Sequence, residues 1–144
     1  MRYAYPYAAE PQPEGGWTVT FPDVPEAITE GDTPEEVAAM AEDALVIALS
    51  FYTDEGQPLP RPSPAGNLPV AIVPPLVAAK LALHDAMLAA GMSNVVLGRR
   101  LGLEEKAVRR LRDPLHRSHI GAVEAALRML GRRLVVDVAD VAAA

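Results

Sequence analysis

The residues with the clearest chemistry form one basic stretch, LGRRLGLEEKAVRRLRDP, at positions 97–114. Its six positively charged side chains are Arg99, Arg100, Lys106, Arg109, Arg110 and Arg112. The chain as a whole is acidic, with 13 Lys and Arg against 19 Asp and Glu. A positive cluster on an acidic protein predicts a surface that approaches a polyanion such as DNA.

The apolar residues of this stretch predict how its charges are displayed. Two short helices joined by a tight glycine turn form a helix-turn-helix, and their shared core would be Leu97, Leu101, Leu103, Val108 and Leu111. Gly98 is small where such helices cross, and Gly102 suits the turn. A recognition helix contacts bases and phosphates with its outward residues. We expect the DNA contacts to be Arg99, Arg100, Glu105, Lys106, Arg109, Arg110 and Arg112. The alternative is a solvated basic face on an ordinary helical bundle.

The charge is divided unevenly along the chain. Residues 1–74 hold two basic and twelve acidic groups, a net of −10, whereas residues 75–144 hold eleven basic and seven acidic groups, a net of +4. Parts of opposite charge attract different partners, so we expect two modules. A segment with seven of the 14 prolines, residues 54–75, separates them. We place the boundary at 74/75 and expect 58–64 to be extended and exposed.

Other features exclude whole classes of protein. The chain has no cysteine, which rules out a disulfide scaffold and thiolate metal sites. Its first 16 residues lack the apolar core of a signal peptide, and its apolar stretches are short. We therefore expect a cytoplasmic protein without a membrane span, metal or cofactor.

The N-terminal part has the pattern of a β-β-β-α-β unit. Alternating residues predict strands at 2–7 and 17–21 around a turn at 14–16, then short strands at 27–31 and 68–73. A helix begins behind Thr33 as N-cap, with Pro34 at its first position and Glu36 completing a capping box. We expect one apolar stripe to pack on the sheet, namely Val37, Met40, Ala44, Ile47 and Phe51.

The C-terminal part reads as helices divided by glycine and proline. Helices are expected at 75–90, 94–101, 104–112 and 119–130, with Ser93 and Ser118 as caps. Residues 133–138, RLVVDV, predict a strand that has no partner within this part, so we expect it to pair with a second copy of the chain. The fold class is thus α+β, followed by an all-α helix-turn-helix part with a C-terminal strand.

One ordered set of motifs carries a family resemblance. It comprises Glu14-Gly15-Gly16 before an aromatic-led strand, Phe21-Pro22-Asp23, Pro25, Thr29, Gly31-Asp32-Thr33 and Glu35-Glu36. Together with the helix-turn-helix pattern, this set resembles the HicB family of antitoxins over nearly the whole chain. The resemblance implies an N-terminal domain like a truncated ribonuclease H fold and a C-terminal DNA-binding domain.

The resemblance also implies partners. HicB proteins bind and silence a small basic HicA toxin, an RNA-cleaving protein, and also repress their own operon. From the unpaired segment 133–138 we expect this chain to be a homodimer or tetramer. An acidic domain is a plausible cover for an RNA-binding surface. We therefore expect the toxin to contact Asp23, Asp32, Glu35 and Glu36, and the C-terminal part to bind an inverted-repeat operator.

Other interpretations of single residues remain. Ribonuclease H chemistry needs carboxylates that converge on two metal ions, but the acidic residues fall at turns, caps and a solvated helix face, so we expect no enzyme. A free-standing transcription regulator with a small-ligand-binding N-terminal part is the alternative. His116 and His119 lack a third metal ligand, and His84 is expected to be solvated beside Lys80. Strand aromatics are expected in the core rather than on an RNA-stacking surface: Tyr3, Tyr5 and Trp17.

Overall fold

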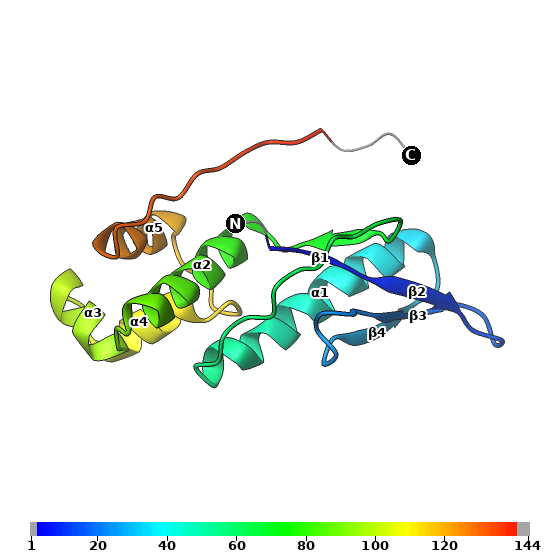
Figure 1. Ribbon diagram of the computed structural model, residues 1–144. Helices are drawn as coiled ribbons and strands as arrows, with labels where there is room; N and C mark the ends of the chain where they lie inside the picture. Colours follow the sequence, from blue (N-terminus) through cyan, green and yellow to red (C-terminus); the bar gives the residue numbers. More distant parts are fainter. Residues whose placement is uncertain (1–2, 141–144) are drawn as a thin grey trace.

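The computed structural model describes residues 3–140, and Arg2, the start of the first predicted strand, lies outside them. A layer of strands packed on one long helix leads into a group of four shorter helices (Figure 1). The order of elements confirms the predicted mixed α and β composition, with short antiparallel strands and five helices.

The first predicted strand divides between two partners. β1 (Ala4–Pro6) pairs antiparallel with β5 (Val70–Ile72), and β2 (Ala8–Pro11) pairs with β3 (Trp17–Thr20). Pro6 has no amide hydrogen to continue the ladder. Tyr7 lies at the change of partner and donates its amide to the Pro69 carbonyl at 3.0 Å. β4 (Ile28–Gly31) pairs with the other edge of β3, so the second sheet has the order β2-β3-β4.

The long helix α1 (Pro34–Asp54) begins as the sequence predicts. The Thr33 hydroxyl accepts the Glu36 amide at 3.2 Å, while the Glu36 carboxylate accepts the Asp32 amide at 3.3 Å. Gly31 permits the sharp return of the chain onto the sheet, because a Cβ there would lie 2.8 Å from the Val37 amide nitrogen. The capping box and this glycine fix the orientation of α1 relative to β4.

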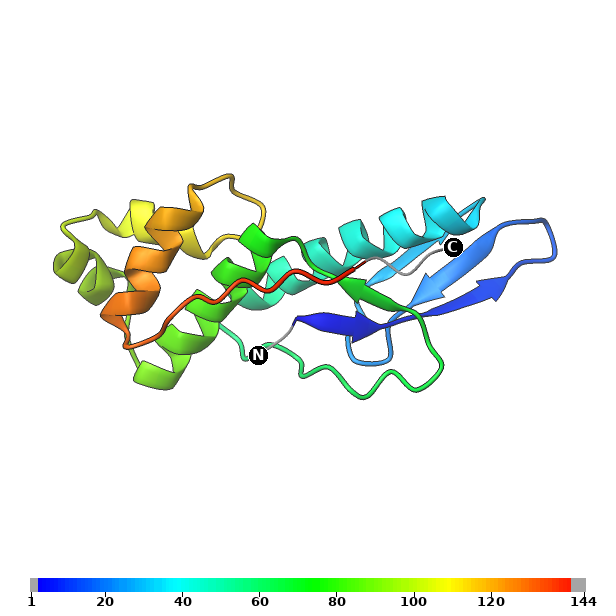
Figure 2. The same cartoon turned by 90° about the horizontal axis from the view of Figure 1, so that it is seen from above.

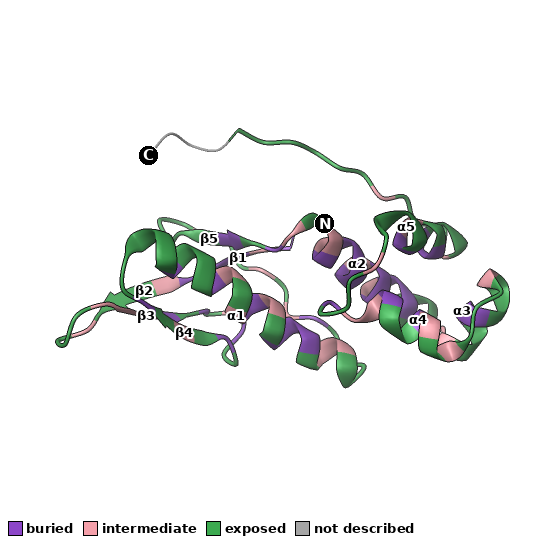
Figure 3. Ribbon diagram, turned by 180° about the vertical axis from the view of Figure 1, so that it is seen from behind, coloured by how far each residue is buried: buried purple, intermediate pink, exposed green. Residues whose placement is uncertain are grey.

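The buried face of α1 differs from the predicted stripe. Val37 is buried as expected, but the rest of the face on the sheet is formed by Ala41, Leu45, Ala48 and Leu49. Met40, Ile47 and Phe51 are exposed, at 37%, 50% and 51% of their surface. Both stripes recur at helical spacing, so periodicity alone left open which of them faces the strands. Figure 3 shows exposed segments along the outer side of α1.

The proline-rich segment is extended but less exposed than predicted. Leu59 is buried in the core of the sheet layer, and the Pro60 carbonyl accepts the Tyr5 hydroxyl at 2.7 Å. The Asp23 carboxylate accepts the backbone amide of Ser63 at 2.8 Å and its hydroxyl as well. Together, these contacts hold the segment against the strands.

The four predicted C-terminal helices are confirmed to within one residue at their ends. They are α2 (Pro75–Ala90), α3 (Asn94–Leu101), α4 (Glu105–Arg112) and α5 (Ile120–Met129). α2 belongs to two hydrophobic cores at once. Its Val77 and Leu81 complete the core of the sheet layer, while Leu83 and Met87 pack with the helices that follow. Figure 2 shows α2 between the two groups of elements.

The predicted strand at 133–138 is not formed. After α5 the chain runs as a long extended trace without regular structure (Figure 1). Leu134 packs on the helical core, but Val135, Val136 and Val138 are exposed. A strand requires a neighbouring strand that shares its backbone hydrogen bonds, and residues 133–138 belong to neither sheet of residues 3–140.

None of the helices described is by itself long and apolar enough to cross a membrane; α2 and α3 reach that length and composition only as a pair, bent by 107°.

Candidate functional site

The helices α3 and α4 are joined by a short turn whose geometry depends on two glycines. Gly102 adopts a left-handed conformation with φ of 69°, as the sequence predicts. At Gly98 a Cβ would lie 2.5 Å from the Leu103 carbonyl oxygen, so only glycine permits the close crossing. Leu97, Val108 and Leu111 are buried between the helices, whereas Leu103 is exposed at the turn instead of joining this core.

Most of the predicted basic residues do point outward. Arg99, Arg100, Lys106, Arg109 and Arg110 are exposed. Glu105 forms an ion pair with Arg109 at 3.0 Å on the same helix face, which satisfies part of the Arg109 guanidinium. The arrangement therefore displays basic side chains on two adjoining helices.

Arg112 differs from the prediction, because its side chain turns inward. It donates to the Asn94 side-chain oxygen and to His84 Nδ1, each at 2.7 Å. Val108 and Leu111 define the buried face of α4. Arg112 is the next residue after Leu111, so it lies at the edge of that face and its long side chain can reach inward. Burial lowers the pKa of Arg112. We assign Arg112 to the packing of α4 on α2 and exclude it from the exposed basic surface.

His84 is fully buried, contrary to the prediction of a solvated side chain. Its Nε2 donates to the Gln57 carbonyl at 2.8 Å, since a carbonyl can only accept. Its Nδ1 must then accept from Arg112, which can only donate. This pair of contacts fixes one neutral tautomer and links the segment after α1 to the end of α4. Burial is the main cause that lowers the pKa of His84.

Lys80 is also fully buried, and its side chain contacts the same helix, α4. Its ammonium donates to the Arg110 carbonyl and to the Ser118 hydroxyl, both at 2.8 Å. The Arg110 carbonyl lies in the last turn of α4, where carbonyls lack partners in the helix and attract positive charge. Ser118 therefore holds Lys80 instead of capping α5, whose N-cap is His119. Burial lowers the pKa of Lys80.

The four acidic residues predicted to contact a toxin divide into two kinds. Asp23 anchors Ser63 of the proline-rich segment, and Glu36 caps α1, so both have structural roles. Asp32 and Glu35 are exposed at the start of α1. The structure thus brings three of the four together at one end of α1 and places Asp23 on the loop after β3.

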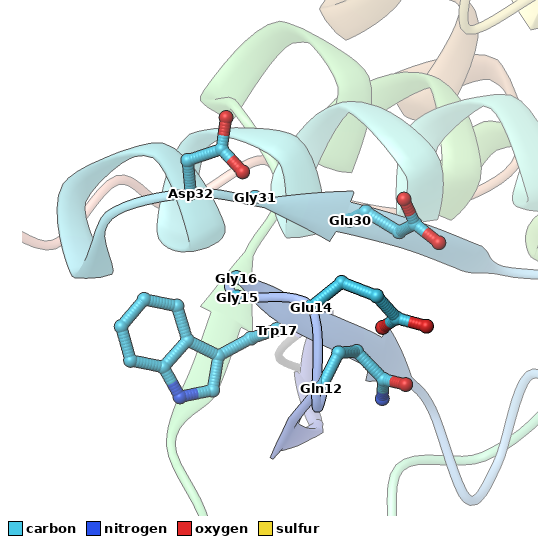
Figure 4. A pocket seen from close by; sticks show the side chains of 8 residues that line it. All are labelled: Gln12, Glu14, Gly15, Gly16, Trp17, Glu30, Gly31 and Asp32. Atoms are coloured by element: carbon cyan, nitrogen blue, oxygen red, sulfur yellow. The ribbon is translucent and has the colours of Figure 1, made fainter.

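A polar pocket lies between the β2–β3 turn and the end of β4 (Figure 4). Gln12, Glu14 and Glu30 lie on one side of it, and Trp17 and Asp32 on the other. Its three carboxylates do not converge, and no group of three potential ligands that could hold a metal ion occurs within residues 3–140. Tyr3 and Tyr5 are buried in the core as predicted, and Trp17 packs partly against the same core.

Sequence reasoning missed two features, the inward polar contacts of α2 and the groove along α1. The groove lies beside β4 and is lined by the exposed side chains Ile28, Met40, Ile47 and Phe51, with Glu26 and Asp43 at its margin. We call it the α1–β4 groove. The signal for it was in the sequence, because α1 carries apolar residues on more than one side.

Comparison with known proteins adds an independent finding. A family described as HicB_like antitoxin of bacterial toxin-antitoxin system matches residues 4–82. Antitoxin HicB 2 of Photorhabdus laumondii is 42% identical over 134 residues, which cover 93% of this chain and 94% of that protein. Antitoxin HicB of Escherichia coli K12 is 39% identical, over 90% of this chain and 95% of its own length. Antitoxin HicB of Pseudomonas fluorescens is 39% identical, with coverage of 93% and 94%.

Proposed function

Because the chain belongs to the family of HicB-like antitoxins of bacterial toxin–antitoxin systems, we propose that it neutralises a small basic RNA-cleaving toxin of the HicA type and represses its own operon. Both roles are binding roles in the cytoplasm, and neither requires a catalytic group, a metal or a cofactor. The observation that carries the proposal is the separation of charge onto two differently built surfaces. A net of −10 lies in residues 1–74, and exposed basic side chains gather on α3 and α4.

The first role is assigned to the N-terminal layer, which we take to be a truncated ribonuclease-H-like domain. A toxin that cleaves RNA must present a basic surface to phosphate, and an acidic protein surface competes with RNA for it. Asp32, Glu35 and Glu36 offer carboxylates at the start of α1, and Asp23 lies on the loop after β3. Their charge would speed association with a basic partner, and their contribution would fall as salt rises.

The second role is assigned to α3 and α4 as a helix-turn-helix. With α4 in the major groove, Lys106, Arg109 and Arg110 would face the operator, and Arg99 and Arg100 would reach phosphates at its side. Glu105 would orient Arg109 through their ion pair. The inward Arg112 would act by holding α4 on α2 and would not contact DNA.

Operator binding requires two copies if the operator is an inverted repeat, and the exposed segment at 133–138 supplies a means of pairing them. Val135, Val136 and Val138 expose apolar β-branched side chains in extended backbone, which readily adds to another strand. A two-fold pair would place two α4 helices roughly 34–36 Å apart, one turn of DNA. We propose a dimer, or a tetramer built from two dimers.

The decisive experiment separates neutralisation from repression in the full-length protein. A cognate HicA-type toxin is expressed from an independent promoter, so that operon repression cannot protect the cell. The Arg109→Ala/Arg110→Ala variant should lose operator binding, by about 1–3 kcal/mol for each arginine that reads a guanine. It should still restore growth and intact RNA, because the N-terminal layer is unchanged.

Arg128→Ala is the matched control for this experiment. Arg128 forms a similar exposed ion pair, with Glu124 at 2.9 Å on α5, but lies outside α3 and α4. It should leave operator affinity and rescue unchanged. If rescue required intact Arg109 and Arg110, the protection would be repression. The free-standing regulator would then replace the antitoxin as the proposed function.

A further inference from the structure

The α1–β4 groove is an apolar surface that is left uncovered by residues 3–140. Ala41, Leu45 and Leu49 turn toward the sheet, while Met40, Ile47 and Phe51 turn outward. Met40, Ala44, Ile47 and Phe51 follow one another at spacings of four, three and four residues, so they lie in one row along the helix. A helix that is apolar on two sides is normally covered on both.

The dimensions of the groove favour a protein occupant. Its volume of about 230 Å³ is below the roughly 300–1,000 Å³ of pockets that enclose small ligands. The small side chain of Ala44 leaves room on the outer side of α1 between the larger residues, and the buried Ala48 lies at the inner edge of the groove. Such a shape accepts a few apolar side chains from another protein surface, in the manner of the central anchors of protein interfaces.

The charge around the groove indicates which protein fits. Glu26 and Asp43 lie at its margin, and α1 carries five acidic residues and no Lys, Arg or His. A second copy placed across this face would set carboxylates against carboxylates, which costs binding energy. RNA is excluded for the same reason, since its phosphates carry the same sign of charge. A basic protein surface with an apolar centre satisfies both the charge and the groove.

We propose that the α1–β4 groove is the main docking site for a basic protein partner, and under the function proposed above that partner is the toxin. Ile28, Ile47 and Phe51 form the apolar centre of the contact, and Glu26 and Asp43 attract its basic rim. The acidic residues at the start of α1 then lie beside the interface, one turn beyond Met40. The contact therefore extends along the outer face of α1 rather than being confined to its N-terminus.

The test compares glutamate substitutions inside and outside the groove in the full chain, with a cognate HicA-type toxin as the probe. Ile47→Glu and Phe51→Glu should each raise the Kd measured by calorimetry at least about 30-fold, as expected for central interface residues. Ile72→Glu is the matched control. Ile72 is exposed on β5, outside the groove, and its substitution should leave the Kd unchanged.

The margin of the groove is tested separately. Asp43→Asn should weaken binding roughly two- to fivefold at low salt and less at high salt, as for an exposed charge pair. Glu10→Gln removes an equal charge from β2 and should have no such effect. Thermal melting and operator binding of each variant report whether the fold is intact, and Ile47→Gln gives a second variant without added charge, which should also weaken binding.

Each outcome separates the groove from the function on which it rests. If the wild-type chain failed to bind the probe, the antitoxin function would be wrong. If the wild type bound and Ile47→Glu bound equally well, the groove would not be the docking site, although the antitoxin function would stand. If Ile47→Glu changed only the sedimentation coefficient of the free chain, the groove would belong to a second copy, and the proposal would be overturned.

Discussion

Replacing Gly98 by alanine should destabilise the protein, although alanine is the better helix former. In an exposed helix interior the exchange stabilises by about 1 kcal/mol. At Gly98 the new Cβ would lie 2.5 Å from the Leu103 carbonyl oxygen, whereas carbon–oxygen contacts normally begin near about 3.3 Å. The turn must therefore move by about 0.8 Å, the difference between those two distances.

The turn cannot move freely, because the Leu103 amide donates to the Gly98 carbonyl at 2.8 Å and α4 begins two residues later. Overpacking of a tight site costs about 1–3 kcal/mol, and a contact with backbone belongs at the upper end of that range. With the helix gain subtracted, the net loss in the free energy of unfolding is about 2 kcal/mol. For a chain of this length the melting temperature should fall by roughly 4–8 °C.

Gly121→Ala is the matched control. Gly121 lies in the first turn of α5, and a Cβ there would meet no atom within 4 Å. This variant should gain up to about 1 kcal/mol. Thermal and urea unfolding followed by circular dichroism measure both changes. Equal stabilisation of the two variants would refute the close crossing of α3 and α4.

Two further outcomes follow from the buried and the extended segments. Burial lowers the pKa of His84 below its ordinary value of 6.5. The unfolded chain therefore takes up a proton on His84 at a higher pH than the folded chain. The contribution of neutral His84 to the free energy of unfolding is complete above pH 6.5 and is lost as the pH falls below it. Wild type should thus lose more stability between neutral and mildly acidic pH than His84→Gln in urea titrations, and parallel pH profiles would contradict the neutral tautomer. Val136→Pro should convert the wild-type oligomer to monomer in sedimentation while Val136→Thr does not, because proline withholds the amide hydrogen that pairing needs. A wild type that stays monomeric at high concentration would contradict pairing through 133–138.

Local signals predicted much of this fold. Thr33, Pro34 and Glu36 marked the start of α1, and the glycines at 91, 102 and 131 marked ends of helices, because caps and left-handed turns depend on neighbouring residues alone. The exposed charges of α4 followed from the apolar spacing of Val108 and Leu111.

The remaining features depend on contacts between residues far apart in the chain. Periodicity predicted one apolar row along α1 but could not tell that another row meets the sheet, so Met40, Ile47 and Phe51 were assigned to the wrong face. His84 was predicted to be solvated because it lies near the polar residues Lys80 and Asp85, and the burial of Lys80 was not predicted. The partners of Lys80 and His84 lie 27 to 38 residues away, and only the packed helices bring those partners within hydrogen-bond distance.

Because α2 contributes residues to both hydrophobic cores, it limits how such a protein can change in evolution. Recombination that exchanged the helical part of the chain at residue 74/75 would replace Val77 and Leu81 together with the helices that follow them, and so would alter the core of the sheet layer as well. The family match itself ends at residue 82, inside α2. A crossover anywhere along this helix joins two half-helices that must each fit a core they did not evolve with. If α4 reads the operator as proposed above, target specificity should therefore change by substitution on the exposed face of α4 more readily than by exchange of whole modules.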